Sequence, residues 1–331
     1  MDSLVWLGPE RLRVEQGARP VPQPSEVVVT VEAAGICGSE VEGYLGRQAN
    51  RTPPLVMGHE FAGTVSAVAD GVDRAWVGRR VTVNPLLSCG LCLACQSARR
   101  NVCERRQLIG VHRPGGFGAE VAVPVSALVL LPDGLDARLA ALAEPLANGV
   151  HAVRLGTLRG TPERAIVIGA GTIGLAALQA ARAAGIAQVV VAEPHVGRRA
   201  QAEALGATEV AASAEAIAES APLVVDAVGR LETRVRGIAL TRAAGTFVAI
   251  GLHADTLELS FHDLIRREIA IQGSYAYSDD DFATALRWLA EGRAGIGNLE
   301  PVRPLSDGPR VFAELAKGAT EAIKIFLSGN A

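Results

Sequence analysis

The sequence predicts an α/β protein in which a β-rich domain precedes a doubly wound parallel sheet. Three observations predict this class. The 331 residues suit two domains at about 150 residues each. The first 130 residues hold short β-rich segments broken by Gly and Pro, whereas apolar strands alternate with Ala-rich helical stretches further on. We expect domains at 1–145 and 146–288, with 289–331 returning to the first domain.

The β-rich domain is predicted from segments that are rich in valine and similar residues and short enough to be strands. We expect strands at Glu26–Ala33, Glu60–Val68, Arg79–Val83 and Glu120–Val125. Strands at this spacing are typical of a barrel or sandwich. The residue pattern then becomes typical of helices, starting with Ala137–Leu146.

The second domain is predicted from runs of apolar residues that helical stretches separate. The expected strands are Ala165–Ile168, Gln188–Ala192, Leu223–Ala227, Thr246–Ile250 and Ile269–Gly273. Continuous apolar strands of this kind indicate a parallel sheet covered by helices on both faces.

Composition excludes several classes of function. A formal net charge of -3 offers no basic footprint for nucleic acid, and the 13 aromatic residues are too few for base-stacking platforms. The first residues lack a signal pattern, and no apolar run of about 18 residues appears. We therefore expect a cytoplasmic protein with neither nucleic acid nor membrane as a partner.

A glycine-rich turn lies between the first expected strand of the second domain and its helix. The run 169–174 reads GAGTIG and fits G-x-G-x-x-G, whose glycines allow a tight turn and close approach to a pyrophosphate at a helix N-terminus. The residues expected to bind a dinucleotide there are Gly169, Gly171, Thr172, Ile173 and Gly174.

Glu193 ends the next expected strand, 19 residues beyond the last glycine. A carboxylate at this place hydrogen-bonds the ribose of NAD and repels the extra phosphate of NADP. Arg198 and Arg199 follow closely and offer a way to hold that phosphate. The sequence therefore favours NAD and leaves NADP as the alternative.

Four of the five cysteines lie in one short segment, as Cys89, Cys92, Cys95 and Cys103. Four thiolates in a closed shell make a structural zinc site. An iron–sulfur cluster is the rival, but its bacterial spacing ends C-x3-C-P, whereas here the last gap is seven residues and Glu104 follows. Plain buried thiols are the third reading.

Three further motifs lie upstream of the glycine-rich turn. Cys37 stands in GICGS, His59 and Glu60 stand in GHE, and Glu144 stands in AEPL. Each motif alone has an ordinary explanation, such as a buried thiol. Because the three motifs occur in one chain with the four-cysteine segment and the glycine-rich turn, chance is a poor explanation for the combination.

In order and content these motifs resemble the zinc-dependent medium-chain dehydrogenases of the alcohol dehydrogenase superfamily, and most closely the polyol (sorbitol) and threonine dehydrogenase branch. The resemblance covers nearly the whole chain. It implies a GroES-like catalytic domain with a structural zinc lobe at about 85–112, followed by a Rossmann domain that binds NAD. It also implies two zinc ions per chain, one catalytic and one structural.

The resemblance implies roles for the upstream motifs. Cys37 and His59 are expected to ligate the catalytic zinc, with Glu60 as third ligand or near neighbour. Glu144 is expected to ligate zinc or hold its water, at a place where simple alcohol dehydrogenases have cysteine. Ser39 matches a proton-relay hydroxyl.

Glu42 is the clearest departure from the family pattern, because many relatives carry histidine there. One hypothesis gives it a place in the pocket, where it takes the proton or binds a substrate hydroxyl or amino group. A solvated surface carboxylate is the alternative.

The resemblance also suggests contacts in the second domain and near the C-terminus. Gly251 and Ser274 match places that approach the nicotinamide half of the cofactor, with strand-end packing as the alternative. Lys324 matches a basic position and is a weaker candidate for cofactor contact. His151 is expected to be structural.

The resemblance therefore predicts an oxidoreductase that transfers hydride between NAD and a secondary hydroxyl of a small polar substrate, first a polyol or sugar alcohol. A 3-hydroxy amino acid such as threonine, an aminocyclitol or a simple alcohol is the alternative substrate. A non-catalytic NAD-binding protein on the same fold is the alternative class, and the zinc-free quinone or enoyl reductases are disfavoured. Relatives form homodimers or homotetramers, and we expect the same here.

Overall fold

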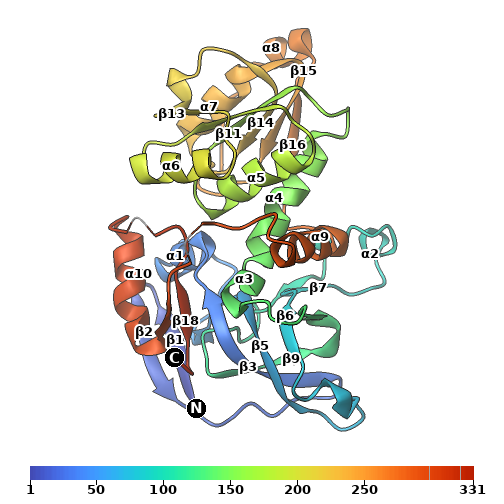
Figure 1. The fold of residues 1–331 in the computed structure, drawn as a ribbon, viewed down its shortest axis with the longest axis vertical. Helices are drawn as coiled ribbons and strands as arrows, with labels where there is room; N and C mark the ends of the chain where they lie inside the picture. The colour runs from blue at the N-terminus through green and yellow to red at the C-terminus, as the bar shows by residue number, and fades with distance from the viewer. Residues whose placement is uncertain (298, 321) are drawn as a thin grey trace. The chain divides into compact units, whose positions relative to one another are not determined.

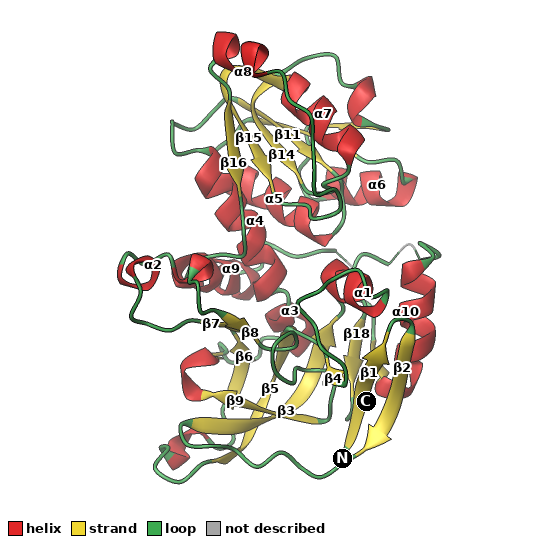
Figure 2. Ribbon diagram, turned by 180° about the vertical axis from the view of Figure 1, so that it is seen from behind, coloured by secondary structure: helices red, strands yellow, loops and turns green. Residues whose placement is uncertain are grey.

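The computed structural model describes residues 1–297, 299–320 and 322–331. The chain forms two compact units. Unit 1 comprises Met1–Glu144, Leu286–Arg293 and Asn298–Ala331, and unit 2 comprises Pro145–Ala285 and Ala294–Gly297. Figure 1 shows the elements in chain order, and Figure 2 shows them from behind.

Unit 1 is built on a seven-stranded sheet, ordered β10-β6-β5-β3-β18-β17, with β9 also paired to β3. Its strands are β3 (Glu26–Gly35), β5 (Glu60–Val68), β6 (Arg80–Val83), β9 (Glu120–Pro124), β10 (Leu128–Leu130), β17 (Val302–Pro304) and β18 (Phe326–Ser328). A second sheet is ordered β2-β1-β4, with β1 (Asp2–Gly8), β2 (Arg11–Gln16) and β4 (Leu55–Val56), and β7 (Leu86–Leu87) pairs with β8 (Gln107–Leu108).

Strand β3 is the centre of unit 1 and is buried along almost its whole length. It reads as a run of valines and alanines because it pairs with β5, β9 and β18, all antiparallel. The C-terminal segment joins the sheet through β18, opposite the last residues of β3. The ends of the chain are therefore combined in one core, which includes Phe61, Phe117 and Phe312.

The helices of unit 1 are short. They are α1 (Gly38–Tyr44), α2 (Leu93–Gln96), α3 (Ala137–Ala141) and α10 (Gly308–Ala316), with one-turn 3-10 segments between strands. The helix predicted over Ala137–Leu146 is instead two helices, α3 and α4 (Ala143–Gly156), which are separated at Leu142. The side chain of Asp136 caps the first of them by accepting from the Arg138 N–H.

Unit 2 is a six-stranded parallel sheet ordered β13-β12-β11-β14-β15-β16. Its strands are β11 (Arg164–Ile168), β12 (Gln188–Ala192), β13 (Glu209–Ala211), β14 (Ala221–Asp226), β15 (Thr241–Ala249) and β16 (Ala270–Gly273). Its helices are α5 (Thr172–Ala183), α6 (Val196–Ala204), α7 (Leu231–Leu240) and α8 (Phe261–Arg267), and α9 (Asp279–Ala290) continues from unit 2 into unit 1. Helix α5 packs on β11 and β12, and α7 packs on β14 and β15.

The strand order of unit 2 reverses at β11, where the chain crosses from one half of the sheet to the other. Binding sites in open α/β sheets lie beyond the carboxyl ends of the strands at this reversal. The turn that follows β11 is the glycine-rich run. The predicted fold class, a β-rich domain followed by a doubly wound sheet, is confirmed.

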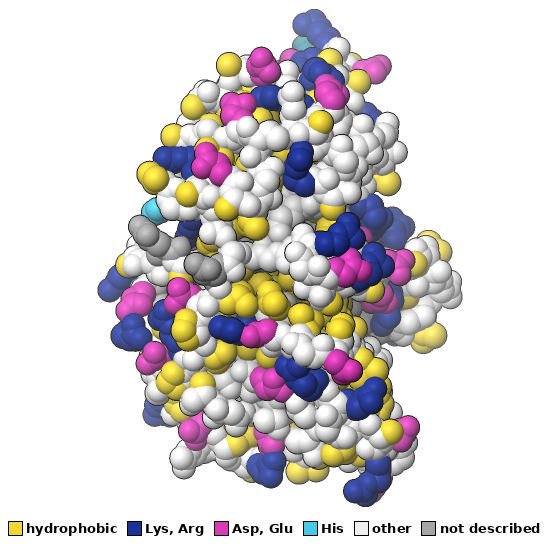
Figure 3. Space-filling view, viewed as in Figure 1, with side chains coloured by type: hydrophobic (Ala, Val, Ile, Leu, Met, Phe, Trp, Pro, Cys, Tyr) yellow, Lys and Arg dark blue, Asp and Glu magenta, His cyan; other side chains and the backbone are white. Residues whose placement is uncertain are grey.

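Two properties of the whole chain complete the description. No helix in the described part of the chain is both long and apolar enough to cross a membrane. On the face shown in Figure 3, basic and acidic side chains are interspersed over the surface.

Candidate active site

Three potential metal ligands converge in unit 1. The ligand atoms of Cys37, His59 and Glu60 all lie within 4.8 Å of one another. The sheet brings them together, because Gly35 at the end of β3 pairs with Glu60 at the start of β5. Cys37 follows the first strand by two residues, and His59 immediately precedes the second.

Glu40 holds the imidazole of this cluster, a role that none of the sequence motifs predicts. Its Oε1 accepts from Nδ1 of His59 at 2.7 Å and from the His59 backbone N–H at 3.0 Å, and its Oε2 accepts from the Cys37 N–H at 2.8 Å. The last contact caps α1, since Glu40 occupies the third helical position. With Nδ1 protonated toward a carboxylate, Nε2 is the nitrogen left to bind a metal.

Burial and charge act in opposite directions on this pair. Burial raises the pKa of the Glu40 carboxyl, but the His59 ring and the Cys37 N–H outweigh it, and the pKa lies below its usual value. Burial would lower the pKa of the His59 ring, yet the charge of Glu40 and the contact with Cys37 raise it well above its ordinary value. Glu40 therefore remains an acceptor in a fully buried position.

Lys324 lies against Glu60, a contact that the sequence did not predict. Its Nζ donates to both carboxylate oxygens, at 2.9 Å and 2.6 Å, and to the Ile36 carbonyl at 3.1 Å. Burial would lower the pKa of Lys324, but the charges of Glu60 and Cys37 outweigh it and the pKa lies above its usual value. Gly35 makes room, because a Cβ there would stand 2.5 Å from Glu60 Oε2. A cofactor contact for Lys324 stays a prediction.

The remaining candidates of unit 1 lie close to this cluster in sequence or in the fold. Ser39 is in the first turn of α1 and is half-buried, and Glu42 follows on the same helix. Glu42 is also half-buried and lies 3.4 Å from Nη1 of Arg47. Glu144 is a buried residue in the first turn of α4. The converging set of described residues is Cys37, His59 and Glu60, so the role of Glu144 as a ligand stays a prediction.

The four-cysteine segment forms a second cluster in unit 1. The sulfur atoms of Cys89, Cys92, Cys95 and Cys103 lie within 4.8 Å of one another, and all four thiols are free. Backbone N–H groups of Leu91 and Cys92 lower the pKa of Cys89 to about 5. A thiolate is the form that binds metal, so this backbone geometry favours a tetrahedral zinc shell.

The glycine-rich turn in unit 2 joins β11 to α5 as predicted. Gly171 precedes the first residue of the helix, so free N–H groups of α5 point at the turn. A Cβ at Gly174 would stand 1.8 Å from the Gly169 carbonyl, so only glycine fits there. Close packing of the helix on the turn is what the third glycine of this motif provides.

Glu193 lies beside this turn at the end of β12. Its carboxylate accepts from the N–H of Ala170 at 2.8 Å and from that of His195 at 3.0 Å. Arg199 Nη1 donates to the carbonyls of Glu193 and Pro194, at 2.7 Å each. The structure therefore orients the predicted acidic residue toward the turn, while one of the two nearby arginines is bonded to backbone.

The other candidates of unit 2 sit at strand ends. Gly251 follows β15, where a Cβ would stand 2.2 Å from the Val228 carbonyl carbon. Ser274 follows β16, is buried and has no hydrogen-bond partner for its hydroxyl among the described residues. Arg198 is half-buried on α6. The cofactor contacts of these three residues stay predictions.

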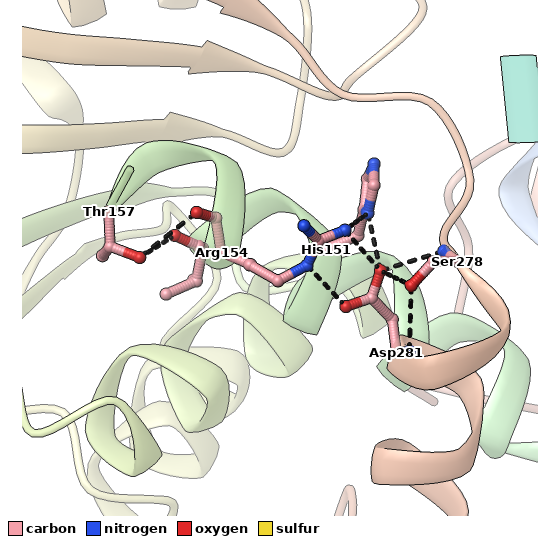
Figure 4. Close-up of polar contacts among 6 residues, drawn as sticks. His151, Arg154, Thr157, Ser278 and Asp281 are labelled. Atoms are coloured by element: carbon pink, nitrogen blue, oxygen red, sulfur yellow. Dashed lines mark hydrogen bonds and ion pairs between the residues drawn. The ribbon is translucent and has the colours of Figure 1, made fainter. Parts of the chain in front are cut away.

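His151 belongs to a polar cluster, shown in Figure 4, in which His151 and Asp281 are buried and Arg154 is exposed. Its Nδ1 lies 2.7 Å from Asp281, whose other oxygen accepts from Arg154 Nε at 2.9 Å. Asp281 also accepts from Ser278 through its N–H at 2.9 Å and its hydroxyl at 2.7 Å. Burial raises the pKa of Asp281, but these donors outweigh it and hold the pKa far below its ordinary value. This cluster joins α4 to the start of α9.

Comparisons with known proteins match two stretches of the chain to known domain families. Residues 23–133 match the alcohol dehydrogenase GroES-like domain, and residues 172–291 match the zinc-binding dehydrogenase domain. L-galactonate-5-dehydrogenase of Escherichia coli K12 is 35% identical over 88% of this chain and 88% of its own length.

Two solved structures are similar along nearly the whole chain. An alcohol dehydrogenase of Escherichia coli CFT073 complexed with NADH has 27% identity and a TM-score of 0.89, with 99% of each chain covered. A protein of Sinorhizobium meliloti 1021 bound to NADP has 31% identity and a TM-score of 0.90, with 99% of this chain and 98% of that chain covered. The resemblance inferred from the motifs is confirmed: the chain belongs to the zinc-binding dehydrogenases of the alcohol and polyol dehydrogenase family.

Proposed function

We propose that this chain is a zinc- and NAD-dependent dehydrogenase that oxidises a secondary hydroxyl of a small polyol or sugar alcohol. The observation that carries the proposal is the convergence of Cys37, His59 and Glu60 within 4.8 Å, in a chain that also has the glycine-rich turn. The relative named for L-galactonate acts on a polyhydroxylated compound, which supports this substrate class.

The donor set fits a catalytic zinc. A thiolate, an imidazole nitrogen and a carboxylate oxygen are all zinc donors, and three protein ligands leave one position for substrate. His59 is already held through Nδ1 by Glu40, and carboxylates commonly orient metal-binding histidines through this nitrogen. When bound, zinc acts as a Lewis acid that makes a hydroxyl far more acidic, as it lowers the pKa of water from about 16 to about 7.

The proposed reaction would break the carbinol C–H bond and transfer its hydride to NAD⁺, while the hydroxyl would lose its proton. The products are a carbonyl compound, NADH and a proton. Ser39 accepts that proton and passes it toward solvent. Glu42 lies on the same helix and is the next acceptor, or it binds a second hydroxyl of the substrate.

Lys324 balances the negative charge of Glu60 in this proposal. Its Nζ is hydrogen-bonded to both carboxylate oxygens, so the ammonium group compensates the charge of the carboxylate. Glu60 then acts either as a third ligand or as a close neighbour of the metal, and Glu144 either as a ligand or as the residue that holds a water. Measuring the zinc content of single variants at Glu60 and at Glu144 separates the two alternatives for each residue.

Unit 2 recognises the dinucleotide through the turn and through Glu193. The N-terminus of α5 would hold the pyrophosphate, and the Glu193 carboxylate would accept from the ribose hydroxyls. Arg199 is bonded to two backbone carbonyls, which favours NAD over NADP. Gly251 and Ser274 face the nicotinamide half.

Two measurements on the purified protein test the proposal. Metal analysis should give two zinc ions per chain, and NAD reduction at 340 nm should be seen with polyols in a screen that includes 3-hydroxy amino acids, aminocyclitols and simple alcohols. The variant His59→Gln should lose one zinc and the activity, whereas His262→Gln, at an exposed histidine of α8, should keep both. A chain without zinc, or one that reduces neither NAD nor NADP with any of these compounds, would refute the proposal.

The setting of the enzyme is part of the proposal. We propose a cytoplasmic protein, because all five thiols are free, and a homodimer or homotetramer, as the family resemblance implies. Light scattering coupled to size exclusion gives the mass, and a mass near 34.4 kDa would contradict the assembly.

A further inference from the structure

Arg51 is a buried cation that forms no ion pair with a carboxylate among the described residues. It lies in the loop between α1 and β4 and is 5% exposed. Its Nη1 donates to the amide oxygen of Gln48, but Nε and Nη2 are buried without a hydrogen-bond partner among the described residues. A buried charge that lacks an ion-pair partner and leaves two of its nitrogens without an acceptor costs several kcal/mol, so its presence requires an explanation.

The neighbouring carboxylates do not supply that partner. Both oxygens of Glu40 are bonded, to His59 and to the Cys37 N–H. Both oxygens of Glu60 are bonded to Lys324. Burial lowers the pKa of Arg51, and the negative charges of Glu40 and Cys37 only partly offset this effect. Arg51 is therefore near the proposed metal ligands without being part of their hydrogen-bond network.

The chain makes room for this guanidinium group on α1. A Cβ at Gly43 would stand 2.8 Å from Cδ and 3.0 Å from Nε of Arg51. Gly43 is one turn after Glu40, so both lie on the same face of the helix. The arginine is thus seated on the helix face that also holds His59, and any residue larger than glycine at position 43 would move it.

The two unpartnered nitrogens form one edge of the guanidinium. Nε–H and an Nη2–H point the same way, and this edge donates two parallel hydrogen bonds to a carboxylate or phosphate. A neutral hydroxyl cannot accept both bonds in this way.

We infer that the Nε–Nη2 edge of Arg51 binds an anionic group of the substrate, so that the polyol is one that carries a carboxylate or a phosphate. The inference rests on the proposed function, because it names the substrate class of the same site. Arg51 acts as a specificity residue: it holds the anionic end while a hydroxyl further along the substrate meets the metal ligands.

The test compares three substrates of matched configuration: an alditol, the corresponding aldonate and the alditol phosphate. With zinc-loaded enzyme, kcat/KM should be at least about tenfold higher for the aldonate or the phosphate than for the alditol, and the preferred compound identifies the group. In Arg51→Gln the ratio of anionic to neutral kcat/KM should fall about 10- to 100-fold, the magnitude of a charge-assisted bidentate contact. Arg51→Lys should recover part of the ratio, since lysine keeps the charge without the fork.

Arg74→Gln is the matched control, because it removes the same charge from an exposed position of unit 1 and should leave the ratio unchanged. A wild-type ratio near one for both anionic compounds, or an unchanged ratio in Arg51→Gln, overturns the inference. If Arg51→Gln does not fold, a competition experiment on the wild-type enzyme replaces it. A short carboxylate or inorganic phosphate should then inhibit oxidation of the alditol competitively, and a lack of such inhibition overturns the inference.

A binding readout separates this inference from the proposed function. If no compound reduces the cofactor, the proposed function fails. An increase in the melting temperature of the wild type with the aldonate or phosphate, but not with the alditol, would still support anion binding by Arg51. This increase should be lost in Arg51→Gln. Oxidation of neutral polyols without any anionic preference has the opposite meaning: the function stands and the inference fails.

Discussion

The variant Glu40→Gln should weaken one zinc site and leave the other intact. Glu40 accepts three hydrogen bonds, two from His59 at 2.7 Å and 3.0 Å and one from Cys37 at 2.8 Å. Glutamine keeps the shape of the side chain but removes its charge, and its NH₂ group cannot accept. At least one of the three donors then faces another donor in a site that excludes water.

Two independent estimates give the magnitude. Loss of a carboxylate that orients a ligand histidine weakens metal binding about 10- to 100-fold, which corresponds to about 1.4–2.7 kcal/mol. A hydrogen bond to a charged group contributes about 1.5–3 kcal/mol, and Glu40 is fully buried, so water does not replace it. We therefore expect about 10- to 100-fold weaker zinc binding at the Cys37 site.

Competition with a chromophoric chelator measures both sites in one titration. The wild type should release two zinc ions, and in Glu40→Gln one of them should be released at a lower chelator concentration while the four-cysteine site is unchanged. Glu120→Gln is the control, because it makes the same substitution at a buried carboxylate that binds Arg19 instead. Wild-type affinities at both sites, or an equal shift at both, would refute the reasoning.

Four further outcomes are expected. Asp281→Asn should lower the free energy of unfolding by about 2–4 kcal/mol at pH 7, because it removes the charge of a buried carboxylate that pairs with His151 and Arg154. Since the pKa of Asp281 is lowered on folding, this stabilisation is present above about pH 4 and lost as the pH falls through the folded pKa, so the difference in urea melts should shrink in acid. Cys103→Ser should remove one zinc per chain and expose the lobe to proteolysis, and full zinc content would contradict the four-thiolate site. Glu193→Ser should reduce the NAD-to-NADP ratio of kcat/KM at least about tenfold, as expected for loss of a charged acceptor, and an unchanged ratio would remove the basis for the NAD preference. Glu42→Gln should alter the pH profile of kcat/KM, and identical profiles would leave Glu42 as a surface carboxylate.

The fold could be predicted because its signals are local. Apolar runs gave the strands of both units, and two of them, β5 and β12, have the predicted bounds. The strands that the sequence analysis did not predict are mostly short, such as β17 and β18 with three residues each. A three-residue strand carries almost no periodicity, so only pairing with a partner distant in the chain identifies it.

The clustering of the metal ligands could also be predicted, since cysteine and histidine are common metal ligands and here stand in recognisable motifs. The orientation of those ligands could not. Glu40 looks like an ordinary carboxylate of a short helix, and its contact with His59 spans 19 residues. It exists because α1 starts beside the end of β3, and only the register of β3 with β5 places that helix next to the histidine.

The two buried cations beside the metal ligands show why composition is an incomplete guide to a site. Lys324 stood out in the sequence as one of two lysines in a chain with 32 basic residues, and it contacts a carboxylate 264 residues away. Arg51 could not stand out among 30 arginines, yet two of its buried nitrogens, Nε and Nη2, have no hydrogen-bond partner among the described residues. A cation whose partner is in the chain stabilises the fold or tunes a ligand, whereas a buried cation without one is ready to receive a partner from outside. That difference lies in the hydrogen bonds and not in the residue types, and it makes Arg51 the residue from which the substrate's charge can be inferred.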